Sequence, residues 1–177
     1  VDPIDGTTNF IRDYRHSCVS IGLLKNEKPY IGVVYNPYLD ELFEAKLDHG
    51  ALLNGKTIHV SDGGLDNSLV SFGTAPYYSD VRKRTFEIAI KVFDRAADLR
   101  RCGSAALDIC YVAAGRTDLY FELCISPWDF AASSLILTEA GGVIKTNGGH
   151  EIDFKNKCAV AAANPKAFDE FKELVDF

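Results

Sequence analysis

Residues 17–44 read SCVSIGLLKNEKPYIGVVYNPYLDELFE. Within this stretch, three short runs rich in apolar and β-branched residues, SCVSIGLL, PYIGVVYN and ELFE, are separated by the polar segments KNEK and NPYLD. Apolar runs joined by polar or proline-containing connections are typical of strands linked by turns. The stretch therefore predicts successive antiparallel strands.

The strand pattern continues to residue 60. Residues 51–60 read ALLNGKTIHV, in which the Asn54-Gly55 pair is a strong hairpin signal because both residue types tolerate positive φ. Residues 61–67, SDGGLDN, are polar and rich in glycine. They predict a boundary between domains, with residues 1–66 on one side and residues 67–177 on the other.

Strands and helices alternate after this boundary. Extended patterns cover residues 68–73, 99–103, 118–123, 143–145 and 159–163. Helical patterns cover residues 80–97, 104–114 and 126–139, and a last helix opens at Asn164-Pro165. In the first of these helices, helical spacing relates the apolar residues Phe86, Ile90, Phe93 and Ala97. An antiparallel sheet region followed by an alternating α/β region predicts a layered α/β fold.

Composition narrows the classes of protein. The chain has 177 residues, of which 47% are hydrophobic, so it can bury a substantial core. It contains no run of roughly 20 apolar residues and no signal-peptide pattern, so we expect a cytoplasmic protein with no membrane segment. The net charge of −6 disfavours general nucleic-acid binding.

Cysteine and histidine spacings do not predict a zinc site. The five cysteines are widely spaced and form no CxxC pair, so we interpret them as reduced core residues. The four histidines show neither H-x-H nor H-E-x-x-H spacing. A zinc hydrolase therefore has no recognisable ligand set.

The first ten residues, VDPIDGTTNF, have the composition of a metal and anion site. Asp2 and Asp5 lie three residues apart on a segment stiffened by proline, with the carbonyl of Ile4 between them, and hard divalent cations bind such oxygen atoms. Gly6 leaves space for a phosphate, and Thr7 begins a possible anion-binding helix start. The structural alternative is an ordinary turn capped by the two aspartates.

A second acidic motif lies far downstream. Residues 127–142 read PWDFAASSLILTEAGG, which puts Asp129 in the first turn of a helix. An aspartate there complements the helix dipole, so a purely structural role is the alternative to metal binding.

Taken together, the two motifs resemble the two signatures of the inositol monophosphatase family, in the same order. Residues 100–122, RRCGSAALDICYVAAGRTDLYFE, are similar to the family's substrate-side loop and helix, so the resemblance covers essentially the whole chain. It implies the sugar phosphatase fold, a layered α/β sandwich. A Gly-x-x-x-Glu-Glu segment that family members carry upstream is absent here, so we expect the N-terminal part to be missing and this chain to be catalytically weak.

The resemblance also implies roles for individual residues. Metal ligands would be Asp2, the carbonyl of Ile4, Asp5 and Asp129. The phosphate would lie against Gly6 and Thr7, and Asp5 and Thr7 would act in catalysis. Substrate contacts would come from Arg100, Gly103, Ser104, Ala105, Glu122 and Asp129, although an exposed surface position is an equal alternative for Arg100.

For the family, the resemblance implies hydrolysis of a phosphate monoester with two or three Mg²⁺ ions, for which Mn²⁺ could substitute. It further implies sensitivity to lithium and a homodimer. Inositol 1-phosphate is the expected substrate, and other sugar or nucleotide phosphates, such as fructose 1,6-bisphosphate and adenosine 3′,5′-bisphosphate, are alternatives because fold alone does not select among them.

Two other interpretations start from the same residues. Phosphatases of the haloacid dehalogenase type carry a D-x-D-G-T motif, but here Pro3 and Ile4 separate the two carboxylates, so the second cannot take the same acid/base position. The non-enzymatic alternative is a degenerate relative that acts as an interaction module. Convergence of the three aspartates in space is the observation that separates an enzyme from such a module.

Overall fold

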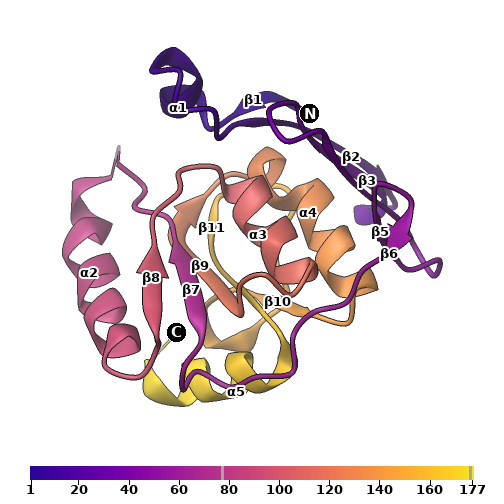
Figure 1. Cartoon of the computed structure of the whole chain (residues 1–177). Coiled ribbons are helices and arrows are strands. Elements are labelled where there is room, and N and C mark those ends of the chain that lie inside the picture. Colours follow the sequence, from indigo (N-terminus) through magenta and orange to yellow (C-terminus); the bar gives the residue numbers. More distant parts are fainter. Residues whose placement is uncertain (77, 176) are drawn as a thin grey trace.

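The computed structural model describes residues 1–76, 78–175 and 177. Two β-sheets alternate with two layers of helices, as Figure 1 shows: sheet A, then α3 and α4, then sheet B, then α2 and α5. The predicted layered α/β sandwich is confirmed.

Sheet A is an antiparallel meander in which each strand pairs with the next along the chain. Its strands are β1 (Asp2–Asp5), β2 (Cys18–Lys25), β3 (Lys28–Asn36), β4 (Glu41–Lys46), β5 (Ala51–Leu53) and β6 (Lys56–Thr57). The hairpin predicted at Asn54-Gly55 joins the last two, with both residues at positive φ. The sequence motif around Asp2 and Asp5 is therefore an edge strand rather than only a turn, and its register with β2 shifts between these two residues.

Sheet B is mixed, with the strand order β10-β11-β9-β7-β8. Its strands are β7 (Leu69–Phe72), β8 (Asp98–Arg100), β9 (Leu119–Ile125), β10 (Val143–Lys145) and β11 (Cys158–Ala163). The pairs of β7 with β8 and β9 are parallel, whereas β11 runs antiparallel to both of its neighbours. Each predicted strand of the second half is present.

The helices are α1 (Thr7–Ile11), α2 (Ser79–Phe93), α3 (Ala105–Ala113), α4 (Pro127–Glu139) and α5 (Pro165–Leu174), with a short 3-10 turn at Asn147–Gly149. Two predicted helix ends are confirmed. Gly115 follows α3 at positive φ, and the Asn164 side chain caps α5 by accepting a hydrogen bond from the Ala167 amide at 2.9 Å. None of the helices in the described ranges is long and apolar enough to cross a bilayer.

Helix α2 differs from its prediction in length and in orientation. It ends at Phe93 instead of residue 97, because the Ala97 amide donates to the Ser68 carbonyl as the chain enters β8. The apolar residues Phe86, Ile90 and Phe93 are about half exposed, and the buried face carries Ile88, Ala89 and Val92 instead. Two apolar stripes share this helix, and periodicity alone does not show which one faces the sheet.

Two hydrophobic clusters lie on opposite faces of sheet B. The first fills the space around α3 and α4 and contains Val34 and Phe43 from sheet A as well as Leu107 and Ile136 from the helices. The second packs α2 and α5 against the other face of sheet B. Because the first cluster draws on residues from both sides of position 66, the division into domains 1–66 and 67–177 stays a prediction.

A pair of glycines brings α4 against sheet A. Gly22 on β2 and Gly32 on β3 are directly opposite in the strand register. A Cβ atom built at Gly32 would lie 2.4 Å from the carbonyl oxygen of Ala132, and one at Gly22 would lie 3.1 Å from the Ala132 amide nitrogen. The absence of side chains at these two positions lets the helix backbone contact the sheet.

We expect Gly32→Ala to lower the free energy of unfolding by about 1–3 kcal/mol, because the added methyl group meets a helix backbone that cannot move independently. Urea unfolding would measure the change. Gly63→Ala is the matched control, since the nearest atom to its new Cβ is 3.6 Å away. Equal stability of the two variants would contradict the close-packing explanation.

Candidate active site

Three carboxylates from distant parts of the sequence converge at one end of the helical layer. Asp2 and Asp5 come from β1, and Asp129 comes from the first turn of α4. One carboxylate oxygen of each lies within 4.8 Å of the others. The convergence that the sequence interpretation requires is therefore present in the structure.

Asp5 is the anchored member of this group. It is only 7% exposed, and its Oδ2 accepts hydrogen bonds from the Ser104 hydroxyl at 2.5 Å and the Ala106 amide at 2.9 Å. Both donors belong to the start of α3, so this carboxylate joins β1 to that helix. Burial raises the pKa of Asp5 to about 6; the two hydrogen bonds oppose the rise, and the nearby carboxylates of Asp2 and Glu122 add to it.

Asp129 is positioned by its own helix. Its Oδ2 accepts a hydrogen bond from the Ser126 amide at 3.1 Å, which holds the side chain at the N-terminus of α4. Burial raises the pKa of Asp129 to about 7, and the negative charge of Asp5 raises it further. Ionising Asp5 and Asp129 together is costly without a compensating positive charge.

This donor set fits a hard divalent cation. The groups offered are carboxylate oxygens, and the backbone carbonyl of Ile4 lies between two of them in sequence, which is the chemistry that Mg²⁺, Mn²⁺ and Ca²⁺ share. The Ile4 peptide is held on both sides: its amide donates to Asp2 Oδ1 at 3.0 Å, and its carbonyl accepts from the Thr7 hydroxyl at 3.0 Å. The mutual repulsion of the acids is what a bound cation would relieve.

Two of these carboxylates, those of Asp5 and Asp129, border a polar cavity of about 350 Å³. Among the residues predicted for the site, those lining it are Asp5, Gly6, Thr7, Gly103, Ser104, Ala105, Glu122 and Asp129. Asp2 belongs to the site through its carboxylate, and Ile4 through its hydrogen bond to Thr7. Most residues singled out in the sequence thus lie around one space.

Gly6 sits at a narrow point of the cavity wall. Its φ is +83°, which disfavours any residue with a Cβ, and a Cβ built there would lie 2.9 Å from the His16 carbonyl and 3.2 Å from the Gly103 carbonyl. Only glycine fits here without displacing these two backbone segments.

Glu122 is held by hydrogen bonds near the end of β9. It accepts from the Tyr120 hydroxyl at 2.6 Å and from the Ala75 amide at 2.9 Å. Burial raises its pKa. A Cβ at Gly73 would lie 2.1 Å from one of its oxygens, so this glycine makes room for the carboxylate.

The two neighbouring arginines have different positions. Arg100 pairs with Asp98 and also donates to the Leu99 carbonyl at 2.9 Å, and it is not among the cavity residues. Arg101 lines the cavity and donates to the Thr74 hydroxyl at 3.0 Å. The substrate contact assigned to Arg100 stays a prediction, and Arg101 is the arginine that the structure brings to the site.

Sequence reasoning also missed Lys157 and Trp128 in the cavity wall. Lys157 contacts Tyr78 and lies outside every motif, so no local pattern marks it. Trp128 is adjacent to Asp129 and is 54% exposed, which is unusual for so large an apolar side chain. Its place beside a proposed metal ligand was the one signal that could have identified it.

Clustered acids beside a polar cavity define a class of proteins that hold hard cations against a small anionic molecule. Comparison with known proteins gives the particular group. A model described as the inositol monophosphatase family matches residues 1–176, and the chain belongs to this family. The resemblance seen in the sequence is confirmed.

Relatives with this architecture come from plants and bacteria. The chain is 46% identical over 175 residues to inositol monophosphatase 2 of Solanum lycopersicum, covering 97% of this chain and 65% of the relative. It is 42% identical over 169 residues to Nus factor SuhB of Escherichia coli K12, covering 94% and 62%. A solved inositol monophosphatase from Anabaena superposes with a TM-score of 0.89 at 38% identity, covering 97% and 68%. The chain thus spans less than two thirds of the length of these curated relatives.

The raised pKa values predict how pH affects the metal-free protein. From pH 3.8, the ordinary pKa, up to about 7, Asp129 is more protonated in the folded state than in the unfolded state, so its contribution to stability falls as pH rises. With a chelator present to remove metal ions, the free energy of unfolding of the unsubstituted parent protein should therefore fall, as pH rises over this range, relative to that of Asp129→Asn. Urea unfolding at several pH values would measure the difference.

Added Mg²⁺ should reverse this trend in the parent but not in Asp129→Asn, because the cation favours the ionised carboxylate. Asp169→Asn, which changes an exposed carboxylate on α5, is the control and should follow the parent at every pH. A parent and an Asp129→Asn variant whose stabilities run parallel would contradict the assigned pKa.

Proposed function

We propose that the protein carrying this chain hydrolyses a phosphate monoester with the help of Mg²⁺, and that its principal substrate is inositol 1-phosphate. The observation that carries the proposal is the convergence of Asp2, Asp5 and Asp129 at the edge of a small polar cavity. Family membership supports it. The alternatives are a related sugar or nucleotide phosphatase and a catalytically weak interaction module.

The charges around the cavity suit a phosphate group. The acids on one side would gather cations, while Arg101 and Lys157 add positive charge to the wall. Because phosphate monoesters hydrolyse very slowly unaided, this concentration of positive charge is what the reaction requires. Gly6 lines the cavity and carries no side chain, so in our proposal a phosphoryl oxygen approaches its backbone.

The residues of the chain hold and orient the reactants. In our proposal Asp2, Asp5 and Asp129 hold two or three ions, which when bound neutralise the phosphoryl oxygens and lower the pKa of a nearby water. The Thr7 hydroxyl donates its proton to the Ile4 carbonyl, so its oxygen is left as an acceptor that can orient a water molecule. Asp5, fixed by two hydrogen bonds, keeps this arrangement rigid.

The alcohol part of the substrate would lie toward α3 and β9. Glu122 has remaining lone pairs that can accept hydrogen bonds from hydroxyl groups, and Gly103, Ser104 and Ala105 line the same wall. A cavity of about 350 Å³ suits a molecule the size of a phosphorylated polyol. The same acceptors could serve a sugar, so a panel of substrates must decide.

Further properties rest on the family resemblance. We propose that Mn²⁺ can replace Mg²⁺, that Li⁺ inhibits by occupying one cation position, and that the protein is a cytoplasmic homodimer.

A second candidate function is supported by one relative. The Escherichia coli protein that is 42% identical is named a Nus factor, so a role in protein assemblies is the alternative for this chain. Phosphate release from a panel of substrates, with and without Mg²⁺, separates the two: no release from any of them would leave the interaction role.

We expect Asp129→Asn or Asp5→Asn to reduce Mg²⁺-dependent phosphate release at least about 10³-fold, since each removes a charge worth several kcal/mol of transition-state stabilisation. The measurement is steady-state release of phosphate by the protein with its natural flanking sequence. Asp169→Asn is the control for loss of a carboxylate. Near-normal turnover in either site variant would refute the assignment.

The two arginines allow a test with neighbouring residues. We expect Arg101→Gln to raise KM for the phosphate monoester about tenfold or more, because it removes a charged hydrogen-bond donor from the cavity wall. Arg100→Gln should change KM little, since its guanidinium pairs with Asp98. The reverse result would restore Arg100 as the substrate contact.

A further inference from the structure

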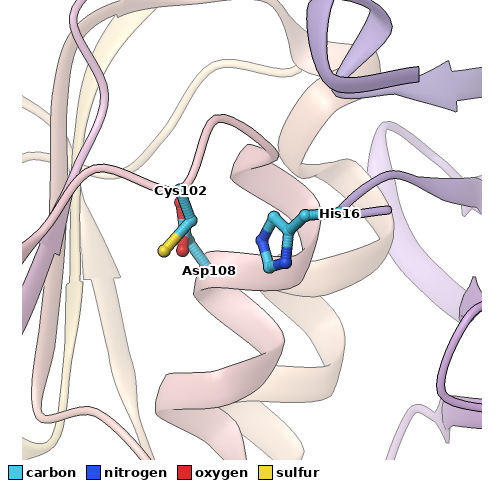
Figure 2. A group of neighbouring side chains, drawn as sticks. All are labelled: His16, Cys102 and Asp108. Atoms are coloured by element: carbon cyan, nitrogen blue, oxygen red, sulfur yellow. The ribbon is translucent and has the colours of Figure 1, made fainter. Parts of the chain in front are cut away.

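A second group of potential ligands lies beside the aspartate cluster and plays no part in the proposed hydrolysis. It consists of His16, Cys102 and Asp108, whose donor atoms all lie within 4.8 Å of one another. Figure 2 shows a ring nitrogen of His16 facing the side chains of Cys102 and Asp108. A nitrogen, a sulfur and an oxygen donor thus point into one space.

A single side chain fixes the two loops that supply this group. The Asn9 amide donates from Nδ2 to the His16 carbonyl at 2.7 Å and to the Cys102 carbonyl at 2.8 Å. Asp108 is fixed separately on α3, where its amide donates to the Ser104 carbonyl at 3.0 Å. The backbone segments that carry the three donors are therefore held by contacts that do not depend on an ion.

The group is incompletely satisfied as it stands. His16 Nε2 is buried and has no hydrogen-bond partner among the residues that the structure describes. Leaving such an atom unpaired is costly, and native proteins seldom do so without a reason. Burial also lowers the pKa of His16, so its imidazole is neutral and has a free lone pair.

The combination of donors indicates the class of ion. Imidazole with thiolate and one carboxylate suits borderline-soft metals such as Zn²⁺, whereas the neighbouring set of three carboxylates suits hard cations. Asp108 also lines the active-site cavity, which gives an ion a route to the group and leaves a position open for water. We propose that His16, Cys102 and Asp108 form a second metal site that binds one Zn²⁺-like ion.

Binding at this site is a simple exchange of protons for metal. The Cys102 thiol gives up its proton to solvent, as does the Asp108 carboxyl where it is protonated, and no electron is transferred. Burial raises the pKa of Cys102 to about 12 and that of Asp108 as well, so the ion must displace protons that these groups hold firmly.

The ion would tie together the two walls that flank Gly6. The carbonyls of His16 and Gly103 lie nearest to a Cβ atom built at Gly6. The proposed site joins His16 itself and Cys102, which directly precedes Gly103. A metal here would hold the phosphate end of the cavity at a fixed width.

Spectroscopy with Co²⁺ tests the proposal, because Co²⁺ bound to a thiolate has an intense near-ultraviolet charge-transfer band. With excess Mg²⁺ present to fill the carboxylate cluster, we expect the parent protein to give this band at one Co²⁺ per chain and Zn²⁺ to remove it. Cys102→Ser should abolish the band. His16→Gln should weaken Co²⁺ affinity at least about tenfold.

The control variants separate this site from its neighbours. Cys18 contacts Asp5, with its Sγ 3.8 Å from Oδ2, so a band arising there would disappear in Cys18→Ser, whereas a band from Cys102 would persist. Cys158→Ser, which changes another partly buried thiol, should also keep the band. Absence of the band in the parent, its survival in Cys102→Ser or its loss in Cys18→Ser would each overturn the proposal. Circular dichroism identifies a variant that fails to fold, and in that event His16→Gln decides alone.

Discussion

The buried Asp5 carboxylate is the contact on which the arrangement of the site depends. It lies on the edge strand of sheet A and accepts hydrogen bonds from the Ser104 hydroxyl and the Ala106 amide at the start of α3. Figure 1 shows β1 passing over the ends of α3 and α4 at this point. Because a buried carboxylate is costly unless it is paired, these two bonds favour the observed position of the strand against the helix. The same atom thus joins two layers and contributes to the cation site.

Burying several acidic side chains together in the site is unfavourable, and the packing of the rest of the fold offsets this cost. Asp2, Asp5, Asp129 and Glu122 face a common region, and the pKa values of the last three are raised chiefly by burial. Local hydrogen bonds from Ser126, Ala106 and Ala75 offset part of that cost. Clusters of like charge of this kind are typical of functional sites, where the stability lost is recovered when the ligand binds.

The sequence predicted the elements well because local signals and tertiary packing agree. Some signals depend only on neighbouring residues and could therefore be predicted from the sequence. They are the turn at Asn54-Gly55, the helix end at Gly115 and the helix cap at Asn164. The orientation of α2 could not be predicted, because the sequence of a helix with two apolar stripes does not show which stripe packs against the sheet. Arg100 and Arg101 are neighbours at the end of β8, and only the structure shows that Arg101 lines the cavity whereas Arg100 does not. Lys157 lines the cavity from a segment without any motif.

Histidine and cysteine spacing shows the same limit. His16 and Cys102 are far apart in sequence, and the Asn9 amide donates hydrogen bonds to the backbone of both. Spacing rules detect ligands that share a helix or a loop, and they miss ligands that a third residue assembles. The aspartate motifs could be identified because Asp2 and Asp5 lie close together in sequence and because the two motifs together resemble the signatures of a known family.

The paired glycines of sheet A have an effect well beyond their own packing. Asp129 stands about one turn along α4 from Ala132, the residue whose backbone rests on Gly22 and Gly32. A side chain at either glycine would press on that helix backbone and strain the packing that holds Asp129 near the acids on β1. Two residues without functional groups, on strands that supply no ligand, therefore determine whether the third carboxylate reaches the other two.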